Sequence, residues 1–159
     1  MAWYLVQSKP GQARRAAEQL QNQGYGCFLP LVTVEKLQRQ QRVQLEEPLF
    51  PGYLFIQLGP EDNWAPIRST RGVSRLVAFN GQPLPVADAL ITEIRQRCGA
   101  QPLPLLAAGD AVRLQEGAFA GLEAVFQCFD GEQRAIILLN LLQREHAVAV
   151  PLSQLQKVT

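Results

Sequence analysis

In residues 1–99, apolar side chains recur in some segments as short strand-like runs and in others at helical spacing. This pattern predicts a domain that contains both strands and helices. Apolar or β-branched runs indicate strands at 3–7, 27–37, 43–45, 53–56 and 74–79, with 27–37 and 43–45 paired as a hairpin around a polar tip. Apolar residues at helical spacing indicate helices over 12–23 and 89–98, the second capped by Asp88. A short helix or turn starts at Pro60 and is interrupted by Pro66, and Asn80-Gly81 forms a turn.

The central strand stands out because both of its faces are apolar. Tyr53 and Phe55 share one face while Leu54 and Ile56 share the other, since successive side chains of a strand point in opposite directions. A strand that faces water on one side carries polar residues there, and this one carries aromatic rings, with Phe50 just before them. Either the protein's own core or a partner must cover these rings.

Residues 109–159 form a second unit, which residues 100–108, a linker rich in Pro, Gly and Ala, separate from the first. One interpretation of this unit is a small β-barrel. Gly117 and Gly121 each cost about 1 kcal/mol inside a helix. Asp130-Gly131, between the apolar runs 125–129 and 135–139, is a strong β-hairpin signal.

The leucine-rich segment 134–145 favours a helix instead. Leucine is a good helix former, and four apolar residues make one stripe at helical spacing: Ala135, Leu138, Leu141 and Leu142. A barrel strand of that composition is apolar on both faces, although a small barrel buries only one. Such a conflict between local and global preference is typical of bistable or functional segments.

Composition narrows the class of protein. Apolar residues make up 47% of the 159 residues and charged residues 18%, a core-forming balance. No run approaches a membrane span, and no basic segment followed by an apolar one begins the chain, so we expect a cytoplasmic protein. The three cysteines are far apart, outside metal-ligand spacing, and are expected to be reduced. With one histidine and no catalytic motif, we expect neither an enzyme nor a cofactor.

Four motifs, in order along the chain, resemble the NusG family of transcription elongation factors. They are Trp3-Tyr4, the run Pro48-Leu49-Phe50-Pro51-Gly52-Tyr53-Leu54-Phe55-Ile56, Thr70-Arg71-Gly72-Val73, and Gly117-Ala118-Phe119-Ala120-Gly121. The last is similar to a KOW motif. The resemblance implies an α+β fold: an N-terminal domain over 1–99 with an antiparallel sheet flanked by helices, and a C-terminal KOW-type unit over 109–159. The leucine-rich segment is most similar to the specialised RfaH branch of the family.

The resemblance also implies two binding surfaces. The aromatic residues Phe50, Tyr53 and Phe55 match the surface that docks on the β′ clamp helices of RNA polymerase. Seven positions match those that touch the exposed single-stranded non-template DNA: Lys9, Gln12, Arg15, Gln19, Arg68, Thr70 and Arg71. Residues 1–99 carry eleven Lys/Arg and eight Asp/Glu, whereas 100–159 carry four and six, which places any nucleic-acid surface in the first domain. A His-Thr-Thr run that contacts the β-subunit gate loop in RfaH is absent here.

In RfaH the C-terminal unit adopts two folds, a helical hairpin docked on the first domain and a released five-stranded β-barrel that binds a small-subunit ribosomal protein. By resemblance, we expect the docked hairpin in the free protein, held by a partly exposed ion pair between Glu47 and Arg134. Leucines 138, 141 and 142 with Phe126 then cover the aromatic rings. Burial of about 300–500 Å² is worth roughly 8–12 kcal/mol before entropy, more than the roughly 2 kcal/mol that two helical glycines cost.

The residues leave two alternative functions open. A general NusG-type factor has a permanent barrel and recruits Rho, and a KOW protein that binds RNA or the ribosome acts without polymerase. In each case we expect a monomer.

Overall fold

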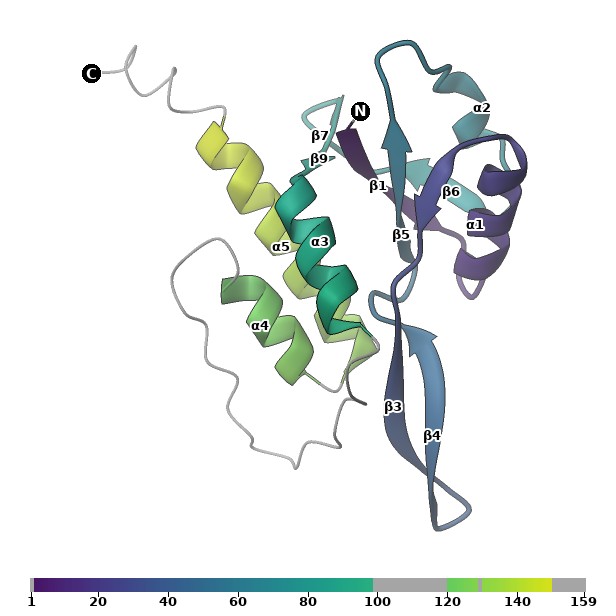
Figure 1. Ribbon diagram of the computed structural model, residues 1–159, viewed down its shortest axis with the longest axis vertical. Helices are drawn as coiled ribbons and strands as arrows, with labels where there is room; N and C mark the ends of the chain where they lie inside the picture. Colours follow the sequence, from purple (N-terminus) through teal and green to yellow (C-terminus); the bar gives the residue numbers. More distant parts are fainter. Residues whose placement is uncertain (1, 99–119, 129, 150–159) are drawn as a thin grey trace.

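The computed structural model describes residues 2–98, 120–128 and 130–149 (Figure 1). The strands are β1 (Ala2–Ser8), β2 (Gly26–Phe28), β3 (Leu31–Gln38), β4 (Gln41–Pro48), β5 (Tyr53–Leu58), β6 (Val73–Leu76), β7 (Ala78–Phe79), β8 (Gln82–Pro83) and β9 (Pro85–Val86). The helices are α1 (Ala13–Asn22), α2 (Ala65–Arg68), α3 (Asp88–Arg97), α4 (Ala120–Gln127) and α5 (Gly131–Ala149). The expected linker and the KOW motif before Ala120 lie outside the described residues.

The main sheet confirms the predicted antiparallel core of an α+β domain. Its strand order is β2-β5-β1-β6, and β9 also pairs with β1. Strand β5 lies between β2 and β1 and is antiparallel to both. The strand with two apolar faces therefore runs through the middle of the sheet, where both faces can be buried.

Helix α1 covers one face of the sheet. Its apolar residues Ala16, Ala17 and Leu20 belong to one buried cluster with Leu54 and Ile56 of β5. This is the stripe predicted from helical spacing, and it explains why the even-numbered side chains of β5 are apolar.

The opposite face is covered by α3 and by the two C-terminal helices, α4 and α5. Helix α3 contributes Leu90, Ile91 and Ile94 to a second cluster, and α4 and α5 pack against each other beside it (Figure 1). Over the described residues 120–128 and 130–149, the C-terminal unit is therefore a pair of packed helices rather than a barrel. Asp130 and Gly131 lie at the junction of the two helices instead of in a β-turn.

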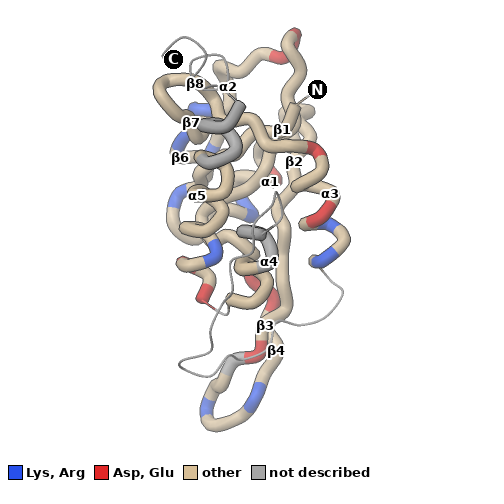
Figure 2. Tube along the Cα trace, turned by 90° about the vertical axis from the view of Figure 1, so that its left-hand side faces the viewer, with Lys and Arg blue, Asp and Glu red and all other residues tan. Residues whose placement is uncertain are grey.

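Strands β3 and β4 form a separate two-stranded arm, which confirms the hairpin predicted around the polar tip. The predicted strand 27–37 was wrong at its start, because Gly26–Phe28 forms β2 and pairs with β5 in the main sheet. Arg39 and Gln40 connect the strands, both with positive φ (50° and 65°), which is the backbone of a two-residue turn that keeps the right-handed twist. Figure 2 shows basic residues near the tip of this arm, where Arg39 lies in the turn and Arg42 pairs with Leu37.

Two details of the predicted helices were wrong. Pro66 does not interrupt a helix but lies in the first turn of α2, where its missing N–H has no helical acceptor to lose. Asp88 is not the cap of α3, because Ala87 holds that position and no side chain caps the helix. Asp88 instead lies in the first turn, where its charge suits the helix dipole. In the part of the chain that the structure describes, no helix has the length and apolarity to cross a membrane.

Candidate functional site

The candidate site is an aromatic patch, defined as Phe50, Tyr53 and Phe55. Phe50 and Phe55 have no exposed surface, and their rings meet edge to face with centroids 6.1 Å apart. Tyr53 is half-buried against the same cluster. Pro48 and Pro51 lie on either side of Phe50 and restrict the backbone that carries its ring, since proline fixes φ. The patch is thus a rigid apolar surface on one face of β5.

The C-terminal helices complete the cover of this patch. Phe50 and Phe55 share one buried cluster with five residues of α4 and α5, namely Val125, Ala135, Leu138, Leu141 and Leu142. Each of the five is at most 7% exposed. Burying a leucine side chain is worth about 1.5–3 kcal/mol, so apolar contact is the main stabilisation of the docked hairpin.

Phe126 lies at the edge of the contact between the hairpin and the first domain. Its ring is half-buried against the cluster, and the guanidinium of Arg97 lies 5.4 Å from its centroid. Arg97 also pairs with Glu93 one turn earlier on α3, with Nε and Oε1 2.9 Å apart. The end of α3 therefore holds α4 by a cation–π contact.

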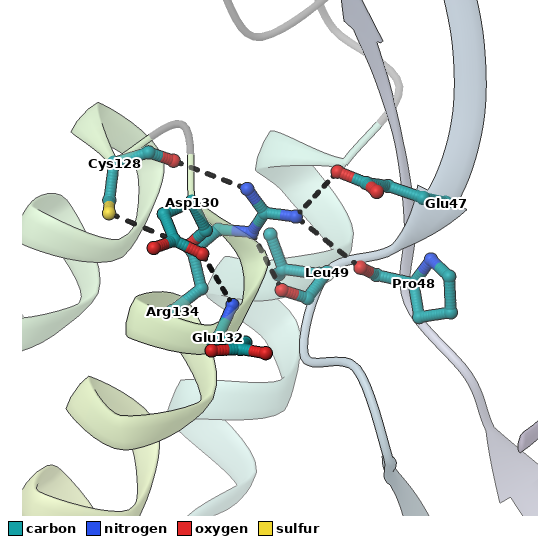
Figure 3. A network of polar contacts seen from close by, with 7 residues as sticks. All are labelled: Glu47, Pro48, Leu49, Cys128, Asp130, Glu132 and Arg134. Carbon is teal, nitrogen blue, oxygen red and sulfur yellow. Dashed lines mark hydrogen bonds and ion pairs between the residues drawn. The ribbon is translucent and has the colours of Figure 1, made fainter. Parts of the chain in front are cut away.

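The guanidinium of Arg134 joins the hairpin to the segment before the patch (Figure 3). Nη2 lies 3.0 Å from Glu47 Oε1 and 3.5 Å from the Pro48 carbonyl oxygen, and Nε donates to the Leu49 carbonyl at 2.7 Å. Nη1 donates to the Cys128 carbonyl at 3.3 Å. Sequence reasoning expected a partly exposed pair, but the Arg134 side chain is fully buried and only Glu47 retains 22% exposure.

The turn between α4 and α5 is built to hold Arg134 in place. Asp130 Oδ1 accepts a hydrogen bond from the Glu132 amide at 3.0 Å, and the Asp130 carbonyl accepts one from the Arg134 amide at 3.0 Å. The side-chain bond caps the Glu132 amide, which has no partner within the helix, and the bond to the Arg134 amide is the first i to i−4 bond of α5. The first turn of α5 is therefore fixed where the arginine leaves it.

Three of the four segments that carry the predicted DNA-binding residues meet on the other side of the sheet, and Arg68 lies at the end of α2, just before the third of them. The Lys9 amide donates to the Gly72 carbonyl at 2.8 Å, which ties the end of β1 to the loop 70–72. That loop also approaches α1, because a Cβ at Gly72 would lie 2.9 Å from the Ala16 nitrogen. The end of β1, the helix and the loop thus form one continuous surface.

The predicted DNA-binding side chains differ in exposure. Lys9, Arg15, Arg68 and Arg71 are exposed, and Gln12 and Gln19 are half-buried. Thr70 is only 6% exposed; its hydroxyl donates to the Pro66 carbonyl and accepts from Gln23 Nε2, both at 2.8 Å. In this structure Thr70 shapes the loop rather than facing solvent, because its hydroxyl is used internally.

Sequence reasoning missed Phe28 as a neighbour of the aromatic patch. Its ring stacks on Phe55 with centroids 5.9 Å apart, and the Arg95 guanidinium lies 4.8 Å from its centroid. The available signal was the pairing of two apolar strands, but which residue faces Phe55 depends on the register of β2 against β5. Among the described residues, no group of three His, Cys, Asp or Glu side chains could hold a metal ion.

Comparison with known proteins identifies the family. A family model described as transcription termination factor nusG matches residues 1–95, more than half of the chain. The chain therefore belongs to the NusG family of transcription termination and antitermination factors.

Relatives named transcription termination/antitermination protein NusG match along nearly their whole length. The protein of Helicobacter pylori (strain J99) is 26% identical over 174 residues, covering 99% of both chains. Those of Yersinia pestis and Escherichia coli (strain K12) are each 29% identical over 175 residues, covering 98% of this chain and 95% of the relative. A solved structure on domain interaction in Thermotoga maritima NusG is 25% identical, with a TM-score of 0.40, and covers 60% of this chain and 55% of that chain. The curated relatives are named as transcription factors, in keeping with the expectation that this chain is not an enzyme.

Proposed function

We propose that this chain is an RfaH-like transcription elongation and antitermination factor that inhibits itself through its C-terminal hairpin. The aromatic patch is its docking surface for the β′ clamp helices of RNA polymerase, and the hairpin occupies that surface at rest. The supporting observation is that Phe50 and Phe55 are fully buried in one cluster with Leu138 and Leu142 of α5.

Competition for the patch follows from this burial. The hairpin and the polymerase helices cannot cover the same rings at the same time. The apparent affinity for polymerase is therefore the affinity of the open form multiplied by the fraction of molecules in which the hairpin has left the patch. Once bound, the first domain bridges the clamp across the polymerase cleft, which favours processive elongation and suppresses pausing and termination.

A second surface on the first domain selects where the factor is recruited. The segments that hold Lys9, Arg15 and Arg71 meet beside α1, and these cations are exposed. Long cationic and amide side chains hold phosphates and read unstacked base edges of single-stranded DNA. In our proposal this surface binds the non-template strand, with Gln12, Gln19 and Arg68 at its margins and Thr70 supporting the loop.

The released C-terminal unit has its own role in this proposal. Freed from the patch, it loses the apolar contacts that favour helix, and the β-hairpin signal at Asp130-Gly131 then favours the five-stranded barrel. In that form it binds a small-subunit ribosomal protein and couples transcription to translation.

The decisive experiment breaks the hairpin contact without altering the first domain. Leu138→Asp places a charge in the cluster, whereas Ile136→Asp changes a residue of the same helix that is 56% exposed. We expect Leu138→Asp to tighten binding of the full chain to RNA polymerase about tenfold or more, and Ile136→Asp to leave it unchanged. Adding Tyr53→Ala to Leu138→Asp removes the gain. Equal affinity of Leu138→Asp and the unaltered chain would favour a general factor whose patch is permanently open.

A further inference from the structure

Gly131 begins α5 at the point where the helix touches Pro51, which lies between Phe50 and Tyr53 of the aromatic patch. Its φ lies outside the left-handed region, so the backbone conformation does not require glycine here. Alanine is the better helix former, and helix propensity alone therefore favours alanine at this position. Another constraint accounts for the glycine.

That constraint is space. A Cβ at position 131 would lie 2.8 Å from Pro51 Cγ, 3.4 Å from Pro51 Cδ and 3.2 Å from Arg134 Nη2. The proline ring is rigid and cannot rotate away from the added atom. The guanidinium is held as well, since the same Nη2 lies 3.0 Å from Glu47 Oε1 and 3.5 Å from the Pro48 carbonyl oxygen. Both neighbours belong to the contact between the hairpin and the first domain.

We propose that Gly131 is the positioning residue that sets how closely the hairpin docks, and thereby whether it can close over the aromatic patch. Without a side chain at 131, α5 approaches Pro51 closely enough for Arg134 to reach its acceptors at Pro48 and Leu49. A single methyl group separates these surfaces and weakens the apolar cover and the arginine contacts together. The proposal rests on the proposed function, in which the docked hairpin is the inhibited state.

The test is hydrogen exchange of the α5 amides from 134 to 142 in the full chain. We expect Gly131→Ala to lower their protection about tenfold or more, the scale of one overpacked methyl group. Ile136→Ala, an exposed change on the same helix, leaves protection unchanged. Unchanged or increased protection in Gly131→Ala would mean that helix propensity governs this position, and the proposal would be wrong.

A second variant assigns the effect to the contact with Pro51. Pro51→Ala removes Cγ and Cδ, the two ring atoms that a Cβ at 131 would meet. In the Gly131→Ala background, Pro51→Ala should therefore restore most of the lost protection. If both double and single variants lose protection equally, Pro51 does not set the docking distance and the proposal fails.

Polymerase titration separates this inference from the proposed function. If Gly131→Ala loses protection and binds polymerase more tightly, both hold. If it loses protection while polymerase affinity stays the same, Gly131 still positions the hairpin, but the hairpin does not inhibit polymerase binding. If protection is kept, the inference about Gly131 fails whatever the affinity does.

Discussion

Arg134 and Glu47, 87 positions apart in the sequence, form an ion pair in which the arginine is fully buried. The buried guanidinium also donates to the Leu49 carbonyl, so charge and hydrogen bonding act at one place. A surface pair contributes about 0–1 kcal/mol, as expected from sequence, whereas removing one partner of a buried pair costs about 3–5 kcal/mol. Because Arg134 is buried, we expect it to stabilise the docked hairpin by more than a surface ion pair would.

Replacing Arg134 should therefore release the hairpin. Arg134→Met keeps much of the side-chain volume but leaves the Leu49 carbonyl and Glu47 without this donor. We expect docking to weaken by about 3 kcal/mol, measured as hydrogen exchange of α5 or as loss of interdomain nuclear Overhauser contacts. The matched control is Arg14→Met, because Arg14 pairs with Glu46 at 3.2 Å with both side chains more than half exposed. That change should move docking by less than about 0.5 kcal/mol.

A charge swap tests whether the pair or the whole set of acceptors holds the hairpin. With Glu47→Arg and Arg134→Glu together, opposite charges still face each other. A glutamate at 134 cannot donate to the carbonyls of Pro48 and Leu49, and we expect the swapped chain to remain open by the same exchange measurement. Full recovery of docking would show that the ion pair alone suffices.

The sequence predicted those parts of the fold that depend on local pattern. The two apolar faces of β5, the stripe on α1 and the helical stripe of Ala135, Leu138, Leu141 and Leu142 all follow from side-chain period. The choice of helix over barrel for the leucine-rich segment could not be made from period alone, because both folds satisfy part of the pattern. In the structure the helical segment shares a buried cluster with Phe50, a long-range contact that the period does not indicate.

The site was predicted less completely than the fold because its details depend on how closely segments distant in the sequence pack against each other. The burial of Arg134 depends on how deeply α5 sits, and this depends on Gly131 and Pro51, which the sequence shows only as a glycine and a proline. The stacking of Phe28 on Phe55 depends on strand register. Thr70 looked available for DNA in the sequence, yet its hydroxyl is used by Pro66 and Gln23.

Gly72 should be far more sensitive to substitution than Gly81, although both have positive φ (89° and 79°). A Cβ at Gly81 meets nothing within 4 Å, so Gly81→Ala costs only the backbone term of about 1–2 kcal/mol. A Cβ at Gly72 lies 2.9 Å from the backbone nitrogen of Ala16, which cannot swing aside as a side chain can. We expect Gly72→Ala to lower the free energy of unfolding by at least about 1 kcal/mol more than Gly81→Ala does. Equal losses in chemical denaturation would contradict the close approach of this loop to α1.

The stability of the protein should fall in alkaline solution because of two half-buried thiols. Burial raises the pKa of Cys27 and of Cys98 from 9.0 to about 11. Between these values the unfolded chain releases thiol protons that the folded chain retains. The contribution of the thiols to the free energy of unfolding is therefore unchanged below about pH 9 and decreases toward pH 11.

Replacing Cys27 by alanine tests this linkage through the slope rather than the level of stability. Cys27→Ala loses some packing at every pH, but the further decrease between about pH 9 and 11 should be smaller than in the unaltered chain. The pKa of Tyr25 is also raised, mainly by burial and secondly by the charge of Asp62, so this phenol also lowers stability as the pH rises. Tyr25→Phe removes that contribution and serves as the comparison. A decrease of unchanged size in Cys27→Ala would show that this thiol does not titrate differently in the folded state.

Binding of single-stranded DNA should depend on salt through the cations beside α1. Each phosphate contact to a single strand contributes about 0.7 to the slope of log affinity against log salt concentration. Arg15→Ala and Arg71→Ala should each weaken binding and reduce that slope by about 0.7, because both side chains are exposed where the three segments meet.

Arg95 provides the matched control for this surface, since its guanidinium lies over the rings of Trp3 and Phe28 on the patch side of the sheet. Arg95→Ala removes the same charge from the protein but no predicted phosphate contact, so the slope should stay as it is. The titrations are made in the full chain with a fluorescent oligonucleotide at several salt concentrations. If the three variants lowered affinity alike, net charge rather than this surface would govern DNA binding. If affinity falls only in Arg15→Ala and Arg71→Ala, the DNA strand lies across α1 and the loop 70–72, next to the hydrogen bond between the Lys9 amide and the Gly72 carbonyl.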